Sequence, residues 1–207
     1  VAVAAQTNAQ CDDICRRYVK RFAGTHIYRF AAQSASRPSD LPASVRWITK
    51  TDELPVGASV TVGTTAKWST VGAFAPFDFL FVDEAWQMTW ADFMLLGAVS
   101  ERFVLIGDPG QIAPVVSIPV ERWETSPRAP HRAAPDLILD DPTIPKLALE
   151  LAACRRLPAD SVDLVRPFYD FAFDAWAEPG ERHVTPKKKA KDPSDRALDL
   201  LEDSSAA

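Results

Sequence analysis

Two short apolar runs that end in acidic residues dominate the hydrophobic pattern of the chain. Phe77–Val82 is followed at once by Asp83 and Glu84. Phe103–Ile106 is followed by a glycine and then Asp108. Uninterrupted apolar runs of this length predict strands buried on both faces, as in parallel sheets. The roughly twenty residues between them are enough for a crossover helix, so both acidic ends are expected at the carboxyl edge of one sheet, where open α/β folds bind ligands.

Periodicity predicts further elements before this unit. Val1–Ala5 is small and apolar, which is consistent with a buried strand. Over residues 11–22 apolar side chains recur at i, i+3, i+4, i+7, i+8 and i+11, which predicts an amphipathic helix with Thr7 or Asn8 as its N-cap. The β-rich run Ser59–Thr65 predicts another strand, and its last residues carry hydroxyl groups.

Two segments are rich in residues that break regular structure. Residues 24–57 are enriched in Ser, Pro, Thr and Asp, and predict a surface connection with at most one short strand, at Val45–Ile48. Residues 115–145 contain six prolines, which predicts an irregular connector. His131 lies in this connector and is expected to be structural or solvated rather than catalytic.

Two more helices and a polar tail complete the pattern. Residues 89–98 are expected to pack one face into the core, and that face consists of Trp90, Phe93, Met94 and Gly97. A helix starting at Pro158 is expected to point three residues inward, namely Val162, Leu164 and Val165. From residue 177 onward the chain is polar, with a basic run at Lys187–Lys191, and is expected to be a solvated tail.

Composition and charge narrow the class of protein. The 207 residues are 47% hydrophobic and 25% charged, which is ordinary for a globular domain. The net charge of −5 argues against a broadly basic nucleic-acid binder, although it does not exclude a local groove. No apolar run reaches membrane-span length, so no membrane partner is expected. Cys11, Cys15 and Cys154 form neither a disulfide framework nor a zinc pattern, and buried thiols in a reducing cytoplasm are expected.

The polar residues at the two strand ends have the chemistry of phosphoryl transfer. Asp83 is suited to hold Mg²⁺ through oxygen. Glu84 points differently and can take a proton from an attacking water. Gln111 carries a neutral amide that can orient water or contact a terminal phosphate. A strand-to-helix cap would account for Asp83 and Glu84 alone, but not for their spacing from the GDPGQ sequence after the second apolar run.

These strand ends also carry motifs of a known enzyme family. Asp83–Gln87, DEAWQ, resembles the Walker B motif (DEA-x-Q) of superfamily-1 helicases. Gly107–Pro114, GDPGQIAP, resembles their motif III, GDPxQLPP, with Ile112 and Ala113 in place of Leu-Pro. The resemblance is to type-B-like members with an AAA-domain ATPase. It implies a RecA-like P-loop NTPase fold of the α/β class, with a parallel sheet flanked by helices and here incomplete.

The resemblance implies ATP and Mg²⁺ as cofactors and assigns roles to the residues of both motifs. It implies that Asp83 binds Mg²⁺, that Glu84 is the catalytic base and that Gln111 senses the γ-phosphate. Gln87 would couple the nucleotide to nucleic acid, and Asp108 would lie at the nucleotide site. The implied activity is ATP-dependent movement on nucleic acid.

Two pairs of polar residues resemble the segments by which these helicases hold nucleic acid. Thr7 and Asn8 resemble motif Ia, and Thr64 and Thr65 resemble the TT-x-K segment after the next strand. The resemblance implies that all four contact the backbone phosphates of single-stranded DNA or RNA. Helix capping and an ST-turn are sufficient structural explanations for the same residues. Trp68 is expected in the core, because one aromatic residue does not make a binding track.

The sequence CRRLP at residues 154–158 resembles the motif IV region of the family. On that match Arg156 would reach the γ-phosphate from a second lobe, although Leu-Pro replaces Met-His-Pro and the register can be shifted by one. A surface salt bridge is the structural alternative. The implied organisation is a first RecA-like lobe (1–118), a Pro-rich connector (119–145), the start of a second lobe (146–176) and a polar tail (177–207).

The phosphate loop of the family, G-x-x-x-x-G-K-[ST], is absent from the 207 residues. The family carries it one strand before motif Ia, so the chain is expected to be a segment that does not hydrolyse ATP by itself. The strand at Phe103–Ile106 is expected to have an open edge, and the chain to be marginally stable. Two alternatives remain: a non-catalytic helicase-like scaffold, and a nuclease or phosphotransferase that uses Asp83, Glu84 and Asp108 as metal ligands.

Overall fold

The computed structural model describes residues 1–71, 77–117 and 119–182. The chain divides into two compact units, Val1–Lys146 and Leu147–Ala207. No helix within the described ranges is long and apolar enough to cross a membrane. The basic run Lys187–Lys191 and the rest of the expected tail beyond residue 182 lie outside the described residues.

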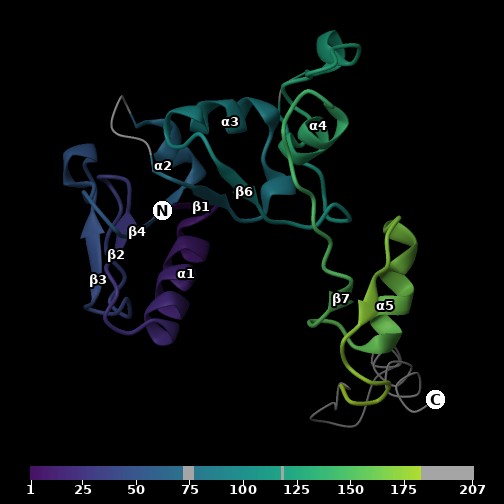
Figure 1. The fold of residues 1–207 in the computed structure, drawn as a ribbon, viewed down its shortest axis with the longest axis horizontal. Coiled ribbons are helices and arrows are strands. Elements are labelled where there is room, and N and C mark those ends of the chain that lie inside the picture. Colours follow the sequence, from purple (N-terminus) through teal and green to yellow (C-terminus); the bar gives the residue numbers. More distant parts are fainter. Residues whose placement is uncertain (72–76, 118, 183–207) are drawn as a thin grey trace, which may run out of the picture. The chain divides into compact units, whose positions relative to one another are not determined.

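A six-stranded sheet forms the centre of the first unit (Figure 1). Every neighbouring pair of strands is parallel, and their order is β3-β2-β4-β1-β5-β6. The strands are β1 (Ala2–Ala5), β2 (Ile27–Phe30), β3 (Val45–Ile48), β4 (Val60–Thr64), β5 (Leu80–Val82) and β6 (Phe103–Leu105). The expected fold class, an α/β fold with a parallel sheet flanked by helices, is confirmed. The two acid-ended strands are neighbours, as predicted, although β5 begins only at Leu80.

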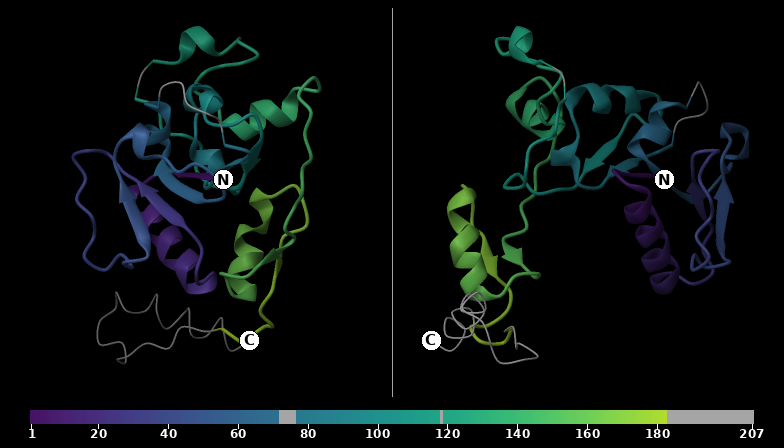
Figure 2. Two further views of the ribbon diagram at one scale, coloured as in Figure 1. Left: turned by 60° about the vertical axis from the view of Figure 1, so that its left-hand side comes forward. Right: turned by 180° about the vertical axis from the view of Figure 1, so that it is seen from behind.

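Helices cover both faces of this sheet (Figure 2). The α-helices of the first unit are α1 (Asn8–Arg21), α2 (Thr65–Ser69), α3 (Trp90–Leu95) and α4 (Ala134–Asp140). Its 3-10 turns are η1 (Thr51–Glu53), η2 (Ala85–Gln87), η3 (Leu96–Ala98) and η4 (Glu121–Trp123). One core cluster lies between α1 and the sheet. There Cys11 and Cys15 meet one residue from each of three strands, namely Ile27 of β2, Val45 of β3 and Val62 of β4. Side chains that alternate along a strand point to opposite faces, so the sheet supplies a second core on its other side.

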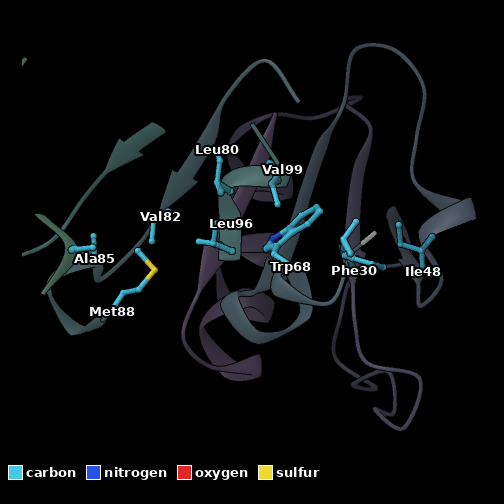
Figure 3. Close-up of a cluster of buried hydrophobic side chains, with 13 residues drawn as sticks. Phe30, Ile48, Trp68, Leu80, Val82, Ala85, Met88, Leu96 and Val99 are labelled. Atoms are coloured by element: carbon cyan, nitrogen blue, oxygen red, sulfur yellow. The ribbon is translucent and has the colours of Figure 1, made fainter. Parts of the chain in front are cut away.

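Trp68 lies in that second core (Figure 3). Its side chain is fully buried, and its ring is 5.1 Å from the Phe30 ring and 5.5 Å from the Phe77 ring between centroids. Its Nε1 donates a hydrogen bond of 2.9 Å to the Val3 carbonyl, which satisfies the polar atom of a buried indole. The expectation that Trp68 is a core residue is confirmed.

The prediction that residues 24–57 are mainly a surface connection is wrong. Within them β2 is an interior strand, paired with β3 on one side and β4 on the other. Ile27 and Phe30 are fully buried, as is Arg29 between them. A buried arginine interrupts the apolar pattern by which an interior strand is recognised, which is why the sequence did not reveal β2. The short strand expected at Val45–Ile48 is confirmed as β3.

The prediction of a wholly irregular connector over residues 115–145 is also wrong. Residues 134–140 form α4, which buries Ala134, Pro135 and Leu137. Pro135 occupies the first turn of this helix, where its missing N–H is not needed. A count of prolines therefore failed here because one of them begins a helix.

The apolar face expected for residues 89–98 is only partly correct. Trp90 and Phe93 pack against the core, but Met94 is 58% exposed and Gly97 is exposed as well. The α-helix ends at Leu95 and continues as the tighter turn η3. That change of helical period turns Leu96 into the core instead.

The second unit contains one short helix and a pair of two-residue strands. The strands β7 (Ala153–Cys154) and β8 (Asp174–Ala175) are parallel, and α5 (Ala159–Val165) leads into η5 (Arg166–Phe168). The helix predicted from Pro158 is confirmed, with Pro158 as its N-cap. Val162 is fully buried as expected, whereas the inward position predicted for Leu164 is wrong because that side chain is 77% exposed.

Strand β6 is the edge of the sheet. Over the residues that the structure describes, β6 is paired with β5 alone. All three of its residues are half-buried, and Ile106 directly after it is 49% exposed. The expected open edge with exposed apolar side chains is therefore present, and such an edge is a template for pairing with another strand.

The buried thiols of α1 give a testable dependence on pH. Burial raises the pKa of Cys11 to about 11 and that of Cys15 to about 12, from 9.0. Because the folded pKa is the higher one, the thiols lose their protons first in the unfolded state. The free energy of unfolding is therefore highest below about pH 9 and falls as pH rises towards 11. We expect the urea midpoint to fall between pH 9 and 10.5, and iodoacetamide at pH 8 to label the half-buried Cys154 but not these two. Labelling of all three at equal rates without urea would contradict this burial.

Candidate functional site

Four neighbouring strands end side by side at the carboxyl edge of the sheet. Their register pairs Ala5 of β1 with Thr64 of β4, Ala4 of β1 with Val82 of β5, and Val82 with Leu105 of β6. Because all four strands are parallel, the segments that follow them emerge at one edge. The predicted site residues at or after the ends of these strands are Thr64 and Thr65, Thr7 and Asn8, Asp83 and Glu84, and Asp108 and Gln111.

Backbone hydrogen bonds fix the acidic turn between two strands. The Asp83 N–H donates to the Ala4 carbonyl at 2.9 Å, and the Ala85 N–H donates to the Ile106 carbonyl at 2.8 Å. Between them Glu84 has φ 53° and ψ 44°, the left-handed conformation, and no other non-glycine residue in the described ranges has a positive φ. This conformation is uncommon for a side chain such as glutamate and gathers at functional sites. The backbone therefore leaves the extended conformation of β5 at Glu84.

Gly107 lets the two strand ends approach closely. A Cβ atom at this position would lie 3.0 Å from the Ala85 nitrogen and 3.0 Å from Cε3 of Trp86. The backbone after β6 therefore lies directly against the turn after β5. Any larger residue would push the two acidic segments apart, so the glycine is required by contact rather than by its own φ.

A side-chain hydrogen bond joins the DEAWQ and GDPGQ segments. Nε2 of Gln87 donates to Oε1 of Gln111 at 3.1 Å. The turn that presents Gln111 is closed by Asp108, whose Oδ1 accepts from the Gly110 N–H at 2.9 Å and whose carbonyl accepts from the Gln111 N–H at 3.2 Å. Since its oxygen is engaged, Gln111 has its amide N–H₂ group left to donate to a ligand.

Asp136 also contacts this site, and sequence reasoning missed it. Its Oδ1 accepts a hydrogen bond of 2.8 Å from Nε1 of Trp86, the variable residue of the DEAWQ segment. The bond ties α4 to the acidic turn, and α4 is further held because the Ala134 N–H donates to the Met88 carbonyl. No sequence signal links residues fifty positions apart in this way, since the prolines around Asp136 concealed its helix.

The site suits an Mg²⁺ ion held by one carboxylate better than a metal ion held by three side chains. Within the described residues no three His, Cys, Asp or Glu side chains are close enough together to hold a metal ion. A nuclease site with Asp83, Glu84 and Asp108 as three shared ligands therefore has no support. Mg²⁺ bound to nucleotide needs only one or two carboxylates, because water and phosphate oxygens complete its shell. Asp83 at a strand end meets that requirement.

Three of the four residues predicted to bind nucleic acid are threonines, and their hydroxyl groups differ in what they already bind. The Thr7 hydroxyl donates to Oε1 of Gln10 at 3.0 Å and accepts from the Gln10 N–H at 3.2 Å, as the N-cap of α1 in a capping box. Thr65 is buried, and its hydroxyl donates to the Ala5 carbonyl at 3.4 Å. The Thr64 oxygen accepts from the Lys67 N–H at 3.1 Å, which leaves the hydroxyl proton for a ligand.

Arg156 belongs to the second unit. Its side chain is exposed, and its carbonyl accepts a hydrogen bond of 3.2 Å from Nη1 of Arg182. The neighbouring Arg155 guanidinium lies 4.3 Å from the centre of the Trp176 ring. A stacked cation of this kind is held within its own unit, whereas no such contact engages the Arg156 guanidinium in the described residues.

Comparison with known proteins shows the fold. No protein-family model matches the chain, and no curated protein matches it. Among solved structures it is similar to the arterivirus nonstructural protein 10 helicase, in a complex with DNA, with a TM-score of 0.51 and 18% sequence identity. The PRRSV helicase aligns at a TM-score of 0.46 and 20% identity over 86% of this chain and 30% of its own. The first alignment covers 92% of this chain but 38% of that helicase, so the chain has the α/β fold of part of a helicase.

Proposed function

We propose that the chain is a segment of an ATP-dependent superfamily-1 helicase or translocase of the type-B-like class. The observation that carries this proposal is the hydrogen bond between Gln87 and Gln111 beside the acidic turn. It joins the two segments on which the resemblance rests, at adjacent parallel strands. The fold likeness to a helicase solved with DNA supports the same assignment. Single-stranded DNA or RNA is the proposed partner.

In this proposal the edge of the sheet holds Mg-ATP and the chain's own residues act on the terminal phosphate. Asp83 would hold the Mg²⁺, which would supply charge neutralisation at the phosphates when bound. Glu84 orients the attacking water and accepts its proton. Gln111 donates its amide N–H₂ to the γ-phosphate, with Asp108 holding the turn. A shift of Gln111 would move Gln87 through their hydrogen bond, and this would couple the nucleotide to neighbouring segments.

The second unit is proposed to supply Arg156 to the nucleotide. An exposed guanidinium that closes on the γ-phosphate would stabilise charge developed in transfer. The proposed organisation remains a first lobe over residues 1–118, a connector over 119–145 and the start of a second lobe over 146–176. Residues 119–145 include α4 and its bond to Trp86, so this connector would be anchored to the first lobe.

The test is hydrolysis of ATP by the protein from the intact reading frame, with and without oligothymidylate or oligouridylate. Glu84→Gln is expected to lower the stimulated rate at least about 100-fold, because it removes the general base. Binding of Mg-ATP should persist, since Asp83 is unchanged. Glu101→Gln is the matched control, because Glu101 is exposed in the turn before β6. Equal rates for both variants would contradict the role of Glu84.

The same measurement separates the motor from a non-catalytic scaffold. A scaffold would bind an oligonucleotide and show no hydrolysis in any variant. The 207-residue chain alone is expected to give no measurable rate, because it lacks the phosphate loop whose amides and lysine hold the β- and γ-phosphates. A rate from this chain that disappears with Glu84→Gln would contradict that expectation.

A further inference from the structure

A buried arginine lies directly behind the first turn of α1. Arg29 on β2 is fully buried, and its Nε donates to Oδ1 of Asp12 at 2.7 Å. Its Nη1 donates to the Phe30 carbonyl at 2.8 Å, and its Nη2 donates to Oδ1 of Asn8 at 2.6 Å. One guanidinium therefore holds two α1 side chains, four residues apart, against the sheet.

The chemistry of these groups fixes the orientation of the Asn8 amide. A guanidinium has donors and no acceptor, so Asn8 must present its carbonyl oxygen to Arg29. The N–H₂ end of the same amide then points away from Arg29. Asn8 is an exposed residue at the start of α1, so both of these donors are open to a ligand outside the sheet.

The neighbouring threonines offer less. The single hydroxyl proton of Thr7 is used in the bond to Gln10, and that of Thr65 in the bond to the Ala5 carbonyl. Thr64 keeps its proton because its oxygen accepts rather than donates. Of the four residues at the ends of β1 and β4, Asn8 and Thr64 thus have side-chain donors to give to an anionic oxygen.

We propose that Arg29 is a positioning residue that turns the Asn8 amide donors outward to the phosphates of a bound single strand. Asn8 and Thr64 supply the side-chain contacts, while Thr7 and Thr65 hold the backbone of their turns. This inference rests on the proposed function, because it assumes that the carboxyl edge of β1 and β4 binds a nucleic-acid backbone. It adds a residue that contacts no nucleic acid itself.

The test measures binding of fluorescein-labelled oligothymidylate and oligouridylate, each about twenty nucleotides long, by fluorescence anisotropy. The full 207-residue chain is used. Asn8→Asp keeps an acceptor for Arg29 but loses both donors, so affinity is expected to fall at least about 10-fold with no fall in Tm. Ala9→Asp adds the same charge to the next exposed position, and is expected to lower affinity less than 3-fold.

A second variant tests positioning without touching Asn8. Arg29→Met combined with Asp12→Leu replaces the buried pair with apolar residues of similar volume, which folded proteins often tolerate. Without Arg29 the Asn8 amide is no longer held in one orientation, so affinity is expected to fall about 3- to 10-fold. The slope of log Kd against log salt should not change, because the neutral Asn8 displaces no counterion. A role in folding alone would lower Tm and leave the affinity of the folded fraction unchanged.

The outcomes separate the inference from the function on which it rests. If the unaltered chain binds neither oligonucleotide, the proposed nucleic-acid site at this edge is overturned and the inference falls with it. If it binds and Asn8→Asp matches Ala9→Asp, the inference alone is wrong. If the double variant binds as tightly as the unaltered chain, Asn8 does not need Arg29. Loss of affinity in both variants with Tm retained, together with an unchanged salt slope for the double variant, supports the positioning role.

Discussion

Replacing Trp68 by alanine is expected to lower the free energy of unfolding of the first unit by about 3–5 kcal/mol. The side chain is fully buried and its ring contacts Phe30 and Phe77. Its removal leaves a large cavity beneath the sheet and an unpaired Val3 carbonyl, which has lost the indole donor. Urea denaturation followed by circular dichroism at 222 nm measures the change.

Trp176→Ala is the matched control for this experiment. Trp176 is 60% exposed in the second unit, so its loss is expected to change the transition of the first unit by less than about 0.5 kcal/mol. If Trp68→Ala and Trp176→Ala shifted the transition equally, Trp68 would not be the centre of the core in Figure 3.

Replacing Arg29 by alanine is expected to destabilise the same unit by about 3–5 kcal/mol. The substitution strands Asp12, which is 7% exposed, without its guanidinium partner. The cost arises from an uncompensated buried charge rather than from loss of a strong bond. The Arg29→Met and Asp12→Leu double variant should therefore recover most of the loss, to within about 1 kcal/mol of the unaltered chain.

Arg46→Ala provides the comparison for Arg29. Arg46 is on the neighbouring strand β3, and its exposed guanidinium lies 5.6 Å from the centre of the Tyr28 ring. Its loss is expected to cost about 0.5–1 kcal/mol at most. Urea midpoints of Arg29→Ala, the double variant and Arg46→Ala, each compared with the unaltered chain, measure these changes. A double variant as unstable as Arg29→Ala would show that Arg29 supplies shape rather than charge.

The strands at the candidate site were readable from the sequence because they are apolar runs with abrupt polar ends. β1, β4, β5 and β6 all follow from such runs, and a rule of parallel sheets places their polar ends together. The prediction that Asp83 and Gln111 follow neighbouring strands is confirmed by the pairing of β5 with β6. Their roles with ATP remain a proposal.

The residues that support this edge were not readable in the same way. Arg29 lies within residues 24–57, which were expected to be a surface connection, and Asp136 lies within residues 115–145, which were expected to be an irregular connector. Both are recognised only when distant segments meet, since Arg29 needs α1 beside β2 and Asp136 needs α4 beside the acidic turn. Thr65 is the converse case, because a hydroxyl expected to face a ligand points into the sheet.

By itself the sequence determined the fold class, most of the strands and helices, and the order of polar residues along the chain, but not β2 or α4. Those follow from local periodicity, capping and turn chemistry, which act between neighbouring residues. Only the tertiary structure decided that β2 is interior, that Arg29 is buried beside Asp12, and that Asn8 rather than Thr7 has free donors. The reason is physical: a buried charge is tolerable only where a distant partner neutralises it, and one sequence does not state which segments become neighbours.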